Sequence, residues 1–92
     1  MKYVIRIHIV NYKDDSHLET NRNDLFEFCR MIHIPRPRLS RLPGGDCWEI
    51  DPNSMSERKS FYCLQALHTL EIMNPYFVCE MKEVDDDYFS VP

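Results

Sequence analysis

The N-terminal residues alternate in character. Their odd positions form an unbroken apolar row, whereas their even positions mix charged side chains with small aliphatic ones. A period of two is typical of a β-strand with one buried face, and the many β-branched and aromatic side chains favour a strand with neighbours on both sides. The pattern therefore predicts a central strand over Lys2–Val10, with one row in the core: Tyr3, Ile5, Ile7 and Ile9.

Apolar residues at helical spacing follow a polar turn. They share one stripe of a helix, and they are Leu25, Phe28, Cys29 and Ile32. The sequence offers two starts for this helix, a capping box at Ser16–Glu19 and a second signal over Thr20–Asn23. Pro35 ends the helix by about His33, because the residue before a proline is pushed out of the α region.

The next segment alternates proline with arginine, which excludes a central strand and suits an exposed one. We expect a short edge strand over Arg38–Leu42. Pro43–Gly45 holds both glycines of the chain, where positive φ costs little, and the apolar Cys47–Ile50 follows shortly after it. A hairpin is therefore predicted here, with Trp48 pointing into the core.

A second helix and a last strand complete the pattern. Ser54 and Glu57 have capping-box spacing at the start of a helix over about Ser56–Met73. The apolar stripe of this helix is Cys63, Ala66, Leu67, Leu70 and Met73. Asn74–Pro75 ends the helix, and alternation returns over Tyr76–Val84, which predicts the final strand.

The predicted order is strand, helix, strand, strand, helix, strand, and it resembles the ferredoxin-like split β-α-β fold. The resemblance implies an α+β, βαββαβ two-layer sandwich in which a four-stranded antiparallel sheet carries two helices on one face. Right-handed crossovers make this the simplest arrangement for the pattern. We expect one domain over residues 1–84 and an acidic C-terminal tail, residues 85–92, that is loose at least in part.

Composition limits the classes of function. The chain has 92 residues, enough for one domain, and it lacks an apolar run long enough to cross a membrane. Four cysteines stand apart in apolar settings without metal-ligand spacing, which is typical of reduced, buried thiols in a cytoplasmic protein. Neither a cofactor nor a metal site is predicted, because the histidines are scattered and no nucleophile has a base at a recognisable spacing.

Charge divides the chain into two parts. Up to Gly45 there are eight lysines and arginines against five acidic residues, and from Asp46 onward there are three against ten. An acidic balance argues against general nucleic-acid binding. RNA-recognition modules share the topology, but they stack bases on exposed aromatics of the central strands. Here Tyr3 belongs to the apolar row and Trp48 points inward, so nucleic acid is not expected as a partner.

Three surfaces remain as binding candidates. In the ferredoxin-like arrangement one sheet face has no helix on it. The even row of the first strand, with an Arg6–Glu80 cross-strand pair, then forms an open face suited to a homodimer. The other two surfaces are a basic edge segment and the acidic tail. The open face carries Arg6, His8, Val78 and Glu80. The basic edge segment carries Arg36, Arg38 and Arg41, and the acidic tail carries Asp85, Asp86, Asp87 and Tyr88.

Opposed charge patches without a catalytic set favour a small intracellular protein-binding module, of the inhibitor or immunity type, whose acidic surface binds a basic target. The alternative is a dimeric, metal-dependent, nuclease-like enzyme. It rests on a resemblance to the small ferredoxin-like nucleases of CRISPR adaptation, which hold a metal through an acidic residue directly after the first strand. Asp14 and Asp15, with His17, form the acid-and-imidazole cluster nearest that position, although Val10-Asn11 replaces the family's Tyr-Asp pair.

Overall fold

The computed structural model describes residues 2–34, 37–39 and 46–90. Its sheet is antiparallel and has β1 (Lys2–Ile9) in the middle, between β3 (Cys47–Ile50) and β4 (Phe77–Val84). A segment of two residues, β2 (Arg38–Leu39), pairs with the outer side of β3. The rest of the predicted edge strand and the predicted turn at its end lie outside the described residues. The central place predicted for the first strand is confirmed.

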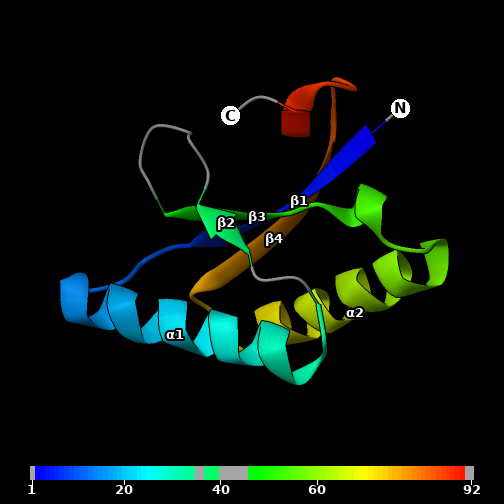
Figure 1. Cartoon of the computed structure of the whole chain (residues 1–92). Helices are drawn as coiled ribbons and strands as arrows, with labels where there is room; N and C mark the ends of the chain where they lie inside the picture. Colours follow the sequence, from blue (N-terminus) through cyan, green and yellow to red (C-terminus); the bar gives the residue numbers. More distant parts are fainter. Residues whose placement is uncertain (1, 35–36, 40–45, 91–92) are drawn as a thin grey trace.

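Helices α1 (Asp15–Met31) and α2 (Glu57–Met73) cover the same face of the sheet (Figure 1). The prediction of an α+β chain with two helices and an antiparallel sheet is confirmed. Two single-turn 3₁₀ helices also occur among the described residues: η1 (Pro52–Ser54) precedes α2, and η2 (Tyr88–Ser90) follows β4. Figure 1 shows η2 on the side of the sheet opposite the helices.

The core lies between the sheet and the two helices. Its buried side chains include Ile5, Ile7, Ile9, Leu18, Leu25, Ile50, Leu67 and Phe77. Tyr3 and Met73, both expected in this core, are instead 38% and 77% exposed. Each lies near the end of its element, where fewer neighbours remain to cover a side chain. The backbone of Tyr3 pairs with the side chain of Asn53, and Met73 is the last residue of α2.

Each helix begins after a side chain that satisfies one of its free N–H groups. Asp14 accepts a hydrogen bond from the backbone N–H of His17 at 2.8 Å, and Ser56 accepts one from Lys59 at 3.1 Å. The predicted capping boxes are therefore not the ones used. Extended backbone at Asp14 and at Ser56 places these two side-chain oxygens over the first turn of each helix.

All four cysteines are free and buried, as their apolar settings predicted. Burial raises the pKa of the Cys29 and Cys79 thiols to about 12 and that of Cys63 to about 11. These three thiols are protonated at neutral pH, and they serve as small apolar side chains that fill the core.

Candidate functional site

The sheet face opposite the helices carries the even row of β1. We expected this face to be open, but the residues after β4 turn back so that η2 lies over it (Figure 1). Val4 is fully buried and Arg6 is only 9% exposed, whereas Val78 is 44% exposed. The homodimer predicted on this face stays a prediction for the accessible part near Val78.

Arg6 is the centre of a polar network on this face. Its Nε atom lies 3.2 Å from Glu49 Oε2, and its Nη2 atom donates to the Tyr88 hydroxyl at 3.3 Å. Its Nη1 atom lies 4.0 Å from Glu80 Oε1. Tyr88 in turn donates its hydroxyl proton to Glu49. The guanidinium group therefore lies between two carboxylates, and the phenol bridges Arg6 and Glu49.

The register of the sheet produces this network. Arg6 is directly opposite Glu80 on β4 and directly opposite Glu49 on β3. The predicted pairing of Arg6 with Glu80 is confirmed, whereas Glu49 was not among the predicted site residues. The signal was present in the sequence, because Glu49 alternates with the inward side chains Trp48 and Ile50 and hence faces the same way as Arg6.

Low exposure reduces the screening of the ion pair by solvent and keeps the phenol neutral. The side chains of Arg6 and Glu49 are 10% and 13% exposed, compared with 41% for Glu80. The hydrogen bond with Tyr88, together with the contact to Glu49, raises the pKa of Arg6 against the opposing effect of burial. Burial, followed by the bond to Glu49, raises the pKa of Tyr88. At neutral pH this arrangement is suited to holding segments together and not to proton transfer.

His8 lies beside this network. Its ring nitrogen Nε2 is 3.2 Å from Glu80 Oε1 and 3.9 Å from Cys47 Sγ. A thiol nucleophile is activated when one ring nitrogen of its base faces the thiol and the other is oriented by an acid. Here Cys47 and Glu80 contact the same nitrogen, and Cys47 is buried. The cluster lacks the geometry of a catalytic triad, and it acts as a polar contact between β1, β3 and β4.

The acidic segment after β4 forms a turn. Asp85, Asp86 and Asp87 are exposed, and the backbone N–H of Tyr88 donates to the carbonyl of Asp85 at 3.0 Å. The hydroxyl of Tyr88 then contacts the sheet through Arg6. Residues 85–90 thus lie against the sheet, where Tyr88 contacts Arg6 and Glu49, and residues 91 and 92 lie outside the described residues. The expectation of a tail that is loose at least in part stays a prediction.

The acid-and-imidazole cluster at the start of α1 has structural contacts. Asp14 caps the helix through the N–H of His17, and the ring nitrogen Nδ1 of His17 accepts from the backbone N–H of Lys13 at 3.0 Å. The His17 ring also packs edge-on against Tyr76, while Asp15 is exposed in the first turn. Across the described residues no group of three His, Cys, Asp or Glu side chains could hold a metal ion. The alternative, a dimeric and metal-dependent nuclease-like enzyme, stays a prediction.

The basic edge segment is described only in part. In the backbone register, Arg38 of β2 is opposite Glu49 of β3. Arg36 and Arg41 lie outside the described residues. A role for the three arginines in binding a partner therefore stays a prediction.

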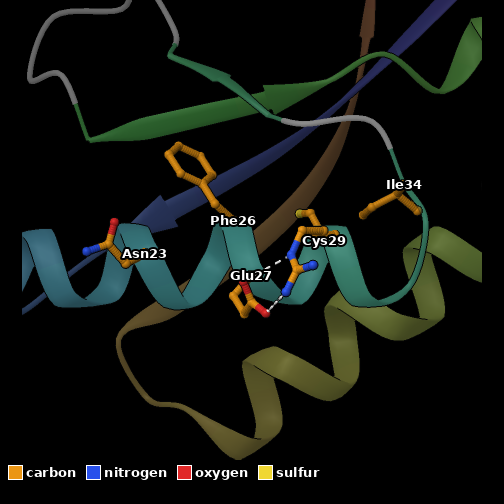
Figure 2. A pocket seen from close by; sticks show the side chains of 6 residues that line it. Asn23, Phe26, Glu27, Cys29 and Ile34 are labelled. Carbon is orange, nitrogen blue, oxygen red and sulfur yellow. Dashed lines mark hydrogen bonds and ion pairs between the residues drawn. The ribbon is translucent and has the colours of Figure 1, made fainter.

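A hollow of about 480 Å³ lies along α1. The described residues that line it are Asn23, Phe26, Glu27, Cys29, Arg30 and Ile34. Figure 2 shows Phe26 directed toward the strands and Glu27 on another side of the helix, where it pairs with Arg30. The hollow offers apolar contacts and one exposed ion pair. Because burial raises the pKa of Cys29 to about 12, its thiol is not a nucleophile at neutral pH.

Comparisons with known proteins give no family assignment. No family model matches the chain, and no curated protein matches it. Among the residues that the structure describes, neither helix is long and apolar enough to cross a membrane. The function is therefore inferred from the contacts and charges of the surfaces described above.

Proposed function

We propose that the chain is a small protein-binding module, of the inhibitor or immunity type, that uses an acidic surface to bind a basic target. The observation that carries the proposal is the turn after β4. Three consecutive carboxylates, Asp85, Asp86 and Asp87, are exposed, while the next residue, Tyr88, is bound to the sheet. The carboxylates are thus presented at a fixed place on the fold.

The segment that contains the turn is mainly acidic. From Phe77 to Ser90 the sequence has five acidic residues and one lysine. Glu80 and Glu83 lie on β4, the strand that leads directly into the turn. A patch of one sign raises the rate of association with an oppositely charged partner and makes that rate sensitive to salt. The expected behaviour is rapid, salt-dependent association.

The network around Arg6 supports this role in two ways. It fixes the end of the turn through Tyr88, so less conformational entropy is lost when a partner binds. It also neutralises a cation beneath the turn, because Arg6 is paired with Glu49 at 3.2 Å. The buried guanidinium group therefore offsets little of the attraction that the exposed carboxylates exert on a basic partner.

The proposal includes a ferredoxin-like fold and a reducing, cytoplasmic location. The order β2-β3-β1-β4, with both helices on one face, agrees with the split β-α-β arrangement. The four free, buried thiols agree with a reducing compartment. The ferredoxin-like fold and the cytoplasmic location are therefore parts of this proposal.

The proposal is tested by capture of a partner at two salt concentrations, roughly 50 and 300 mM, from a lysate of the native host, with mass spectrometry of the bound proteins. The turn variant changes all three aspartates: Asp85→Asn, Asp86→Asn and Asp87→Asn. The control variant removes the same number of charges from exposed positions in the helical layer: Asp15→Asn, Asp24→Asn and Glu57→Gln.

We expect the parent and the control to capture the same basic protein at low salt, and less of it at high salt. The turn variant should lose this capture, because the charges that attract the partner are gone. Equal capture by the turn variant and the parent would show that the acidic turn is not the binding surface.

A further inference from the structure

The outer edge of β4 presents backbone groups that β1 does not use. The backbone N–H of Val10 donates to the carbonyl of Tyr76 at 2.8 Å, so this opposed pair is a hydrogen-bonded one. Bonded and non-bonded pairs alternate along an antiparallel ladder. The N–H and C=O groups that point away from β1 therefore belong to Phe77, Cys79, Met81 and Glu83. No described strand pairs with this edge.

Part of the edge is already satisfied within the chain. The N–H of Phe77 donates to the carbonyl of Asn74 at 3.2 Å, and the N–H of Cys79 donates to Glu71 Oε2 at 2.5 Å. Among the described residues nothing accepts from the N–H groups of Met81 and Glu83, and Met81 is 42% exposed. An extended stretch centred on Met81 is thus available to another strand.

We propose that this edge of β4 pairs antiparallel with the same edge of a second copy of the chain, with Met81 on the two-fold axis. The pairing forms two bonds between Met81 and Met81 of the partner subunit. It forms two more between the N–H of Glu83 and the carbonyl of Cys79 across the axis. The two sheets then become one continuous sheet, and the unpaired edge is removed.

Charge favours Met81 over its charged neighbours as the position on the axis. In this register Glu80 lies opposite Lys82 of the partner subunit, and Lys82 lies opposite the partner's Glu80. An axis at Glu80, at Lys82 or at Glu83 would place two identical charges directly opposite each other, which destabilises a strand pair. An axis at Cys79 would need the N–H that Glu71 already accepts.

The same alternation also gives an apolar contact. Val78 and Val84 lie on the face of Glu80 and Lys82, and in the Met81 register Val78 is opposite Val84 of the partner subunit. Val78 is 44% exposed in the single chain, so the pairing covers an apolar side chain. Charges that protect the edge in one copy thus become complementary when two copies meet.

A sedimentation experiment measures the association of the full-length chain over a range of concentrations. Lys82→Glu places identical charges at both cross-strand pairs, and we expect the association constant to fall about tenfold or more. Lys13→Glu makes the same change of charge in the exposed loop before α1 and should leave association unchanged. A parent that stays monomeric at the highest concentration, or equal association of the parent and Lys82→Glu, overturns the proposal.

A cross-linking experiment tests the register directly. Residues in a hydrogen-bonded antiparallel pair have Cα atoms about 5.5 Å apart, which lies within the range that a disulfide can span. Met81→Cys should therefore form a covalent dimer under mild oxidation. Lys13→Cys, which places a thiol in the exposed loop before α1, should not. The native thiols are buried and do not compete. Failure of Met81→Cys to cross-link, or an equal yield from Lys13→Cys, overturns the proposed register.

Discussion

The Tyr88 hydroxyl accepts a hydrogen bond from Nη2 of Arg6 at 3.3 Å, although the two residues are 82 positions apart in the chain. This contact joins the last described turn to the central strand. It also covers a guanidinium group that would otherwise face solvent on the side of the sheet opposite α1 and α2. The acidic turn is therefore linked to the central strand by a side-chain hydrogen bond.

Tyr88→Phe tests the strength of this contact. The variant keeps the ring but removes the hydroxyl, so Arg6 and Glu49 each lose one hydrogen bond. We expect the free energy of unfolding to fall by about 1–2 kcal/mol, measured by urea denaturation. Tyr62→Phe is the matched control, because that ring is 49% exposed on α2. Equal midpoints for the two variants would mean that the Tyr88 hydroxyl contributes nothing to stability.

Glu49→Gln tests whether the buried ion pair needs its charge. The change leaves Arg6 with Glu80 as its nearest carboxylate, at 4.0 Å. We expect a loss of about 2 kcal/mol, because the poorly exposed Arg6 loses its ion pair and keeps only a neutral amide as the acceptor.

The control for this prediction is an ion pair of the same type in solvent. Glu27→Gln removes the carboxylate that pairs with Arg30 on the surface of α1, where the side chains are 55% and 76% exposed. It should leave the midpoint of urea denaturation nearly unchanged, because an ion pair exposed to solvent contributes little to stability. Similar losses for Glu49→Gln and Glu27→Gln would contradict the account of the Arg6 network as buried and structural.

The buried thiols predict a loss of stability in alkali. Folding raises the pKa of Cys29 and Cys79 to about 12 and that of Cys63 to about 11, so the folded chain binds these protons more tightly than the unfolded one. Their contribution is complete below the ordinary thiol pKa of about 8.5 and is lost as the pH rises toward the folded values. Between these limits each thiol adds a slope of about −1.4 kcal/mol per pH unit.

Urea denaturation between pH 7 and pH 10.5, a window that spans the ordinary thiol pKa, measures this slope. Cys29→Ala should reduce its steepness by about 1.4 kcal/mol per pH unit, because one titrating group is removed. Leu25→Val, at another fully buried position of α1, should lower stability at every pH without changing the slope. If the slope is unaltered in Cys29→Ala, the pKa of this thiol does not differ between the folded and unfolded chains.

Alternation and helical spacing were sufficient to predict the main elements. The bounds of the strand Cys47–Ile50 were predicted to the residue, and the second helix to within one residue of its start. These properties are local, because the period with which side chains face the core is set by the backbone of each element. The start of the first helix was predicted less well. Several nearby polar residues can act as a cap, and the approach of the chain at Asp14 decides between them.

By itself the sequence determined that the chain forms two helices and an antiparallel sheet, and that its cysteines are buried. Only the tertiary structure decided what happens on the second face of the sheet. The contact of Tyr88 with Arg6 and Glu49 joins three segments that are distant in the sequence, and no local sequence pattern predicts such a contact. The outer edge of β4, which no described strand pairs with, was decided in the same way, because strand order, and not strand propensity, determines which backbone groups remain unpaired.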